Sequence, residues 1–189
     1  MKNSSKSSRS WSRALRVALF ALVTAPPIQA AELVTTKDGD ARLIIEVSSD
    51  RGATPVYEIH ESMVVTVRAS RAANAYCFYQ QGDGKIIRIF PNRFHPSPAV
   101  PAGTQLRIPD ETMKFIIRFD QALALEAVRC FANELDPPPS LPSSLASDQG
   151  PLPLADLEAV SAAFLGVAPA SATATMSVTV IDAQPLGPR

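Results

Sequence analysis

The sequence predicts a mainly β protein, a β-sandwich of the immunoglobulin type or a similar one, with about seven to nine short strands. Short runs that alternate apolar and polar residues recur along the chain, and turn residues separate them. The clearest hairpin signal is the stretch 74–92, NAYCFYQQGDGKIIRIFPN, in which Asp83-Gly84 joins an aromatic strand to an aliphatic one. A hairpin alone is marginally stable in water, so the rest of the chain must cover it.

The first 30 residues predict a cleaved secretory signal peptide. Five basic residues precede a short apolar run at 17–25, and the small residue Ala30 lies where a signal peptidase would cut. This run is too short to span a bilayer, which needs about 20 apolar residues. We therefore expect a mature chain that begins near Ala31, in the periplasm or outside the cell, without stable insertion in the membrane.

Loss of this leader would change the net charge. The whole chain has 18 basic and 18 acidic residues, and removing the five basic residues of the leader leaves 13 against 18, a net charge of −5. The mature sequence also lacks a basic cluster. Because nucleic acids bind to concentrated positive charge, this composition disfavours a nucleic-acid partner.

The strands of the mature chain follow from the alternation of apolar and polar residues. The predicted strands are 41–48, a short edge strand at 56–59, 63–69, the hairpin arms 76–79 and 85–90, 105–108, 114–119 and 126–132. The strand 114–119 would bury Phe115, Ile117 and Phe119 and turn the residues between them outward. Three prolines and a glycine make the segment 94–103 a loop.

The C-terminal part begins with a proline-rich segment, 137–153, whose six prolines and several serines predict irregular structure. This segment could tether a small separate domain or cross the sandwich as a long connection. After it, 154–165 has apolar residues at helical spacing between Pro153 and Gly166, and 173–181 alternates as a final strand. One helix and one strand cannot bury their own apolar faces, so we expect 154–182 to dock on the sandwich and 31–189 to form a single domain.

The hairpin and its surroundings resemble a known family. The motifs that carry the resemblance are MVVTVRA (63–69), YCFYQQGDGKIIRIFPN (76–92), VPAG (100–103), LRIP (106–109), KFIIRF (114–119) and VRCFA (128–132). The pattern is similar to the exported domain of unknown function 4384 over roughly residues 55–133. Residues 60–62 and 121–125 depart from it, since they replace glycine-containing turns. The resemblance implies a β-rich accessory or docking domain of bacterial envelope proteins and supplies no catalytic residues.

Cys77 and Cys130 are the two cysteines of the chain. An even number of cysteines in an exported protein favours a disulfide, and their segments are similar enough to lie beside each other in a sheet. Two buried free thiols that pack as small apolar residues are the alternative. The cysteines are too far apart in sequence for a C-x-x-C redox centre.

The sequence does not contain a pattern typical of catalysis, metal binding or cofactor binding. The two histidines, His60 and His95, lack metal-ligand spacing, and neither a G-x-S-x-G motif nor a nucleophile–base pattern is present. Tyr76 and Phe78 would share one face of their strand and Tyr79 the other. Packing in the core explains these aromatic residues better than stacking on sugars.

These observations predict a non-enzymatic binding or assembly module that contacts another envelope or secretion-system protein. The contact would use a sheet edge or the proline-rich loops 94–103 and 137–153, and Arg93, Phe94 and His95 form the candidate contact loop. The alternative is a small-ligand-binding domain with a pocket between sheet and helix. An exported hydrolase is disfavoured because a base–nucleophile pair is missing.

Overall fold

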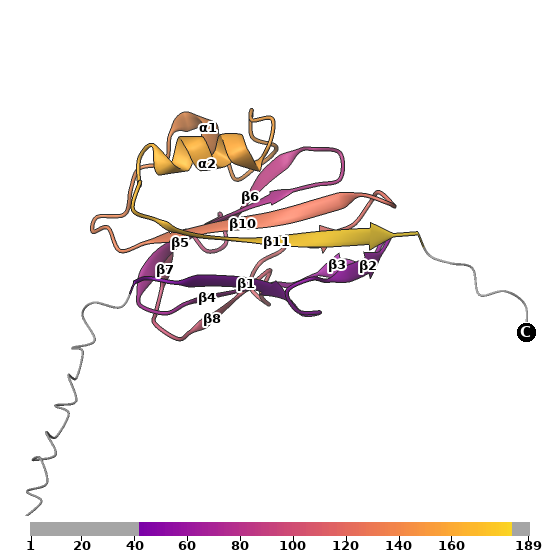
Figure 1. Ribbon diagram of the computed structural model, residues 1–189, viewed down its shortest axis with the longest axis horizontal. Coiled ribbons are helices and arrows are strands. Elements are labelled where there is room, and N and C mark those ends of the chain that lie inside the picture. Colours follow the sequence, from indigo (N-terminus) through magenta and orange to yellow (C-terminus); the bar gives the residue numbers. More distant parts are fainter. Residues whose placement is uncertain (1–41, 183–189) are drawn as a thin grey trace, which may run out of the picture. The chain divides into compact units, whose positions relative to one another are not determined.

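One large β-sheet faces two smaller ones in the computed structural model, which describes residues 42–182 (Figure 1). The larger sheet lies between the smaller sheets on one side and the helices on the other (Figure 1). The mainly β fold with a C-terminal helix and strand is therefore confirmed. The predicted signal peptide, 1–30, lies outside the described residues.

The larger sheet has six strands. Its order is β2-β11-β10-β5-β6, and β7 pairs with β5 beside that path. All its pairs are antiparallel except β2 with β11. Its strands are β2 (Val56–Glu58), β5 (Ala73–Gln80), β6 (Ile86–Phe90), β7 (Ala99–Val100), β10 (Leu125–Asn133) and β11 (Ala172–Ile181).

Two smaller sheets face it. One has three strands in the order β1-β4-β8, and the other pairs β3 with β9. Their strands are β1 (Ile45–Ser49), β3 (Ser62–Met63), β4 (Val65–Ala69), β8 (Gln105–Ile108) and β9 (Ile117–Arg118). The described residues thus hold eleven strands rather than the seven to nine predicted, because β3, β7 and β9 are pairings of two residues each. Segment 114–119 alternates in burial as predicted but forms a ladder only at β9, since β3 is equally short.

The helical layer contains two helices, α1 (Ser143–Ala146) and α2 (Leu157–Leu165). The prediction of one helix was wrong because the proline-rich segment 137–153 contains α1. The start predicted at residue 154 was also wrong: Asp156 caps α2 and accepts a hydrogen bond from the N–H of Ala159 at 2.7 Å. An acidic N-cap satisfies one of the free N–H groups of the first turn, which fixes the helix start at this residue.

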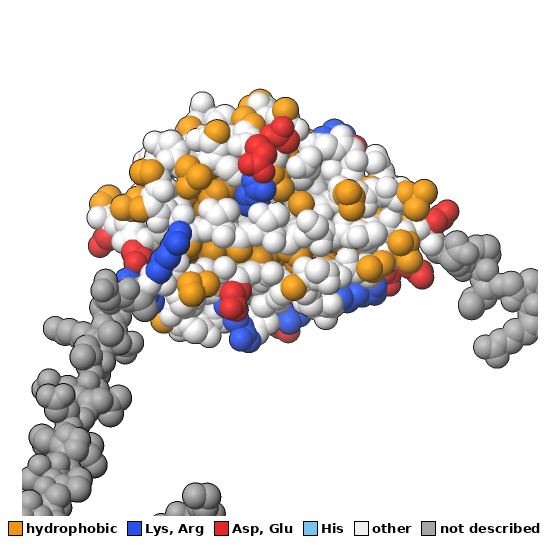
Figure 2. Space-filling model, viewed as in Figure 1, with side chains coloured by type: hydrophobic (Ala, Val, Ile, Leu, Met, Phe, Trp, Pro, Cys, Tyr) orange, Lys and Arg blue, Asp and Glu red, His pale blue; other side chains and the backbone are white. Residues whose placement is uncertain are grey.

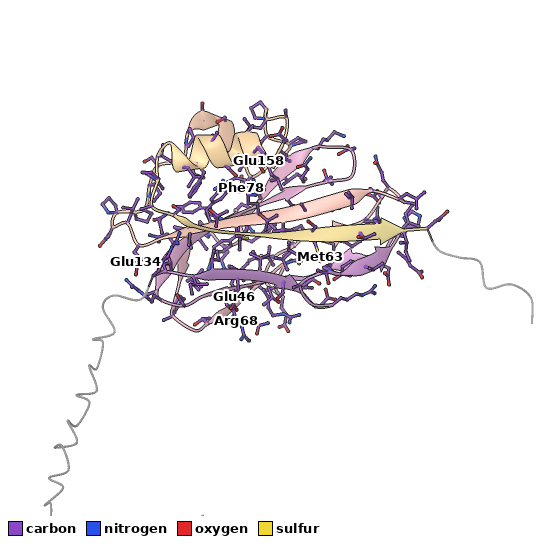
Figure 3. The ribbon with its side chains drawn as sticks, viewed as in Figure 1. Glu46, Met63, Arg68, Phe78, Glu134 and Glu158 are labelled. Carbon is purple, nitrogen blue, oxygen red and sulfur yellow. A yellow bond between two sulfur atoms is a disulfide. The ribbon has the colours of Figure 1, made fainter. Side chains whose placement is uncertain are left out.

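Apolar side chains form two clusters, one on each face of the larger sheet. The inter-sheet core lies between the sheets, and the helix-side core lies beneath the helices; Figure 3 shows Met63 between the sheets and Phe78 facing α2. The inter-sheet core includes Met63, Val65, Val67, Cys77, Tyr79, Ile108, Phe119, Val128, Cys130, Met176, Val178 and Val180. The helix-side core contains Tyr76, Phe78, Ile86, Phe131, Leu145, Leu152, Leu157, Val160, Phe164 and Ala168.

The two cysteines lie directly opposite each other on β5 and β10. Their Cα atoms are 4.1 Å apart and their Sγ atoms are at the disulfide distance of 2.03 Å. The predicted placement of Cys77 beside Cys130 is therefore confirmed. Both residues are fully buried in the inter-sheet core.

Candidate functional site

A groove runs along the free edge of the larger sheet at β6. Strand β6 is an edge strand, because within residues 42–182 it forms a ladder only with β5. The turn between them confirms the predicted Asp83-Gly84 hairpin: Gly84 adopts a φ of 82°, a left-handed conformation that favours glycine. The groove has a volume of about 530 Å³, within the range of about 300–1,000 Å³ typical of ligand sites.

The first wall of the groove is the loop that follows β6. The buried side chain of Asn92 organises this loop, since its Nδ2 donates to the carbonyl of Ile89 at 2.7 Å and its Oδ1 accepts from the N–H groups of Phe94 and His95. Of the three predicted contact residues, Arg93 and Phe94 line the groove. His95 does not line it; its ring packs edge-on against Phe90, with centroids 5.2 Å apart.

The second wall is the extended segment that leads into β9. Phe115 of this segment stacks on Phe94 across the groove, with ring centroids 6.3 Å apart. Lys114, Ile116 and Arg118 all point outward, and Ile116 is 66% exposed. The sequence predicted their outward direction but not their place in a site. The sequence feature that could have indicated a site is Ile116, an apolar residue at a predicted outward position between two basic ones, where a polar residue would be expected.

The third wall comes from the proline-rich segment, at residues 148–150. Hydrogen bonds to β6 and to the loop after it hold this part in place. The guanidinium of Arg88 donates to the carbonyl of Ala146 at 2.8 Å, that of Arg93 donates to the carbonyl of Asp148 at 3.2 Å, and the N–H of Leu152 donates to the carbonyl of Ile86 at 2.7 Å. The segment thus packs along the sheet edge, and both predicted proline-rich loops contribute to one groove.

The groove is positively charged. It is lined by four basic side chains (Arg88, Arg93, Lys114, Arg118) and two acidic ones (Asp120, Asp148), a net charge of +2. Burial lowers the pKa of Arg88, and the negative charge of Asp148 opposes that shift. Arg118 pairs with Asp120 at 3.1 Å, with both side chains more than half exposed. Lys114 forms neither an ion pair nor a hydrogen bond with any described residue.

A buried acid lies beside the floor of the groove. Tyr79 lines the floor, and its hydroxyl donates to Glu126, which is 3% exposed. Burial raises the pKa of Glu126 from its ordinary 4.5 to about 7, while the N–H of Gly82 opposes the shift. The backbone of Gly82 can lie this close to β10 because glycine has no side chain. A Cβ at Gly82 would lie 2.7 Å from the Cβ of Ala124. The linear sequence did not indicate this pair.

Exposed apolar residues also gather away from the groove, at what we call the apolar corner. Figure 2 shows hydrophobic side chains on the surface where β2 and β11 end. Val56, Leu123, Leu125 and Ile181 contribute to this corner, and Leu123 is 85% exposed. None of the four lines the groove.

The remaining candidates do not assemble into a second site. His60 lies exposed in a turn with a φ of 72°. Residues 42–182 contain no group of three or more metal-binding side chains. Within the same residues, no helix has the length and apolar character needed to cross a membrane.

Comparison with known proteins identifies part of the chain. A family model described as a domain of unknown function (DUF4384) matches residues 56–134, which confirms the resemblance found in the sequence. No curated protein and no solved structure matches the chain. The matched part runs from β2 to β10, so α1, α2, β11 and the third wall of the groove lie outside it.

Proposed function

We propose that the chain, part of which matches a domain of unknown function, is a non-enzymatic binding module of the bacterial envelope. It is exported by a signal peptide at 1–30 and acts in the periplasm or outside the cell, where it contacts another envelope or secretion-system protein. The pairing of Cys77 with Cys130 at disulfide distance is compatible with such an oxidising compartment.

The observation that carries this proposal is the composition of the groove. An edge strand and loops from two distant parts of the sequence converge there, and they expose aromatic, aliphatic and basic side chains together. Exposed sheet edges and conformationally fixed loops are common contact surfaces for other polypeptides. Aromatic residues and arginine are also the residue types enriched where proteins bind each other.

A second candidate function is the binding of a small anionic ligand, which the volume of about 530 Å³ favours. The ligand would occupy the edge groove. The space between sheet and helix, where the sequence suggested a pocket, is filled by the fully buried Phe78, Phe131 and Phe164.

The non-enzymatic character of the module is part of the proposal. General acid–base and nucleophilic catalysis need a base within reach of a nucleophile in an accessible site. Glu126, the carboxyl group that could act as a base beside the groove, is buried with its partner Tyr79, and neither His60 nor His95 lines the groove.

Site-specific photo-cross-linking in the native envelope tests the proposal. A photoreactive amino acid replaces Ile116 at the groove, and the control replaces the more exposed Leu123 at the apolar corner. We expect one discrete protein adduct from position 116 that is absent at position 123. Identical adducts at both positions, or none at 116, would count against a protein-binding groove. Stabilisation of the purified protein by a small anion without any adduct would favour the second candidate.

A further inference from the structure

We propose that the groove binds an acidic segment of the partner in extended conformation, with acidic, apolar and acidic side chains at positions i, i+2 and i+4. This inference rests on the proposed function and specifies the chemistry of the partner. Three features of the groove lead to it: its charge, its spacing and its backbone edge.

The charge of the groove is opposite to that of the rest of the molecule. The lining carries a net charge of +2, whereas the predicted mature chain, with 13 basic and 18 acidic residues, carries −5. A local excess of positive charge on an acidic protein favours an anionic partner. Lys114 has no ion-pair partner among the described residues, and Arg118 pairs with Asp120 only at the surface, where an ion pair contributes little. Both cations can therefore pair with carboxylates of a partner at low cost.

The spacing of the second wall matches an extended chain. Burial alternates over residues 113–120, so that Lys114, Ile116 and Arg118 face outward at a period of two. Successive outward residues of an extended chain lie about 7 Å apart. A partner segment that runs alongside in extended conformation has the same period. It would place one carboxylate opposite Lys114, an apolar side chain against Ile116 and a second carboxylate opposite Arg118.

The edge of β6 is partly occupied by the proline-rich segment and offers further backbone hydrogen bonds at Arg88. Ile86 directs its carbonyl away from β5, where it accepts from Leu152 at 2.7 Å. Arg88 lies two residues further along the strand, so its backbone groups point the same way. In the described part of the chain, no backbone group outside the sheet forms a hydrogen bond with the backbone of Arg88. A recess that combines an edge strand with the stacked pair Phe94 and Phe115 favours an extended polypeptide as its occupant.

The test measures binding of a fluorescein-labelled peptide, Ser-Glu-Ser-Val-Ser-Glu-Ser, by fluorescence anisotropy at low salt. The control peptide places the two glutamates side by side. We expect the first peptide to bind at least about tenfold more tightly than the control. We also expect the variant Lys114→Glu/Arg118→Glu to lose at least about tenfold in affinity, because two attractive pairs become repulsive.

The matched control variant is Arg68→Glu/Arg107→Glu, which makes the same charge change on β4 and β8 outside the groove. It should bind the peptide like the wild type, and thermal melts should show that both variants are folded. Equal loss in both variants, equal binding of both peptides, or binding of anionic phosphatidylglycerol vesicles without binding of the peptide would overturn the inference. If position 116 still cross-links to a protein while the acidic peptide does not bind, this inference fails and the proposed function survives.

Discussion

The inter-sheet core and the helix-side core lie on opposite faces of the same strands, yet different kinds of side chain form them. The inter-sheet core joins sheet to sheet through mostly aliphatic side chains and contains the Cys77–Cys130 pair. The helix-side core is aromatic at its centre, where the rings of Phe131 and Phe164 stack with centroids 4.5 Å apart and Phe78 packs edge-on against both. The central strands β5 and β10 are therefore buried on both faces, and only one of those faces is covered by another sheet.

Each face of the larger sheet also holds an ionisable group: Glu126 is buried, whereas Arg129 is only partly buried. In the inter-sheet core, Glu126 accepts from the Tyr79 hydroxyl and lacks a cationic partner in the described residues. On the helix side, Arg129 donates to the carbonyl of Leu157 at 3.0 Å and pairs with Glu158 at 2.8 Å. Arg129 thus links α2 to the sheet, whereas Glu126 is stable chiefly in its neutral form.

The family match covers only part of each core. Residues 56–134 include Phe78 and Phe131 but exclude Phe164, and they include β10 but exclude its neighbour β11. The following predictions test whether the two cores depend on each other, beginning with the largest expected effect.

Truncation after residue 136 should abolish folding. The shortened chain would expose the helix-side face of β5 and leave the ladder of β10 without β11, and the lost apolar burial exceeds the usual margin of stability. Far-ultraviolet circular dichroism and size-exclusion chromatography measure the outcome. A chain that ends at residue 182 is the control and should remain folded. A folded, monomeric product from the shorter chain would show that the inter-sheet core is sufficient.

Phe164→Ala and Phe119→Ala compare the cores directly, since each removes one fully buried phenyl ring. We expect each to lower the free energy of unfolding by about 3–5 kcal/mol. If the cores form one cooperative unit, both variants will show a single urea transition with an unchanged slope. A second transition in Phe164→Ala alone would mean that the helical layer unfolds independently.

The double variant Cys77→Ala/Cys130→Ala tests the cross-link in the inter-sheet core. A disulfide that closes a sequence separation of 53 residues constrains the unfolded chain, so its loss should cost about 4 kcal/mol. Urea unfolding of the variant and of the oxidised wild type gives this difference. Equal stability of the two proteins would contradict a stabilising disulfide.

Glu126→Gln should remove a pH dependence that originates in the inter-sheet core. Burial raises the pKa of Glu126 from 4.5 to about 7, so the folded protein binds this proton more tightly than the unfolded chain does. The stability of the wild type should therefore be fullest below about pH 4.5, fall as the pH rises to about 7 and then level off. The shift corresponds to about 3 kcal/mol.

The glutamine variant keeps the hydrogen bond from Tyr79 but cannot ionise. Its advantage over the wild type should grow from near zero at pH 4 to about 3 kcal/mol at pH 8, measured by urea unfolding at both values. A constant difference across this range would show that Glu126 does not carry the pH dependence.

Part of the candidate site could be predicted from local sequence. Arg93 and Phe94 follow a strand and a proline, a position that predicts an exposed loop, and both line the groove. Arg88, Tyr79 and residues 148–150 could not be predicted in this way. Their place in the groove depends on where the proline-rich segment returns to the sheet edge, and hydrogen bonds between residues far apart in sequence determine that point.

The sequence by itself determined most of the longer strands, the Asp83-Gly84 turn, the placement of Cys77 beside Cys130 and the resemblance to a known family. These follow from side-chain alternation and turn chemistry, which act over a few residues. Only the tertiary structure decided that Phe78 and Cys77 are both buried, on opposite faces of β5, and that residues of a segment with six prolines pack on the larger sheet. Alternation distinguishes the two faces of a strand but cannot show how many of them are covered, because that depends on which distant residues supply the opposing apolar surface.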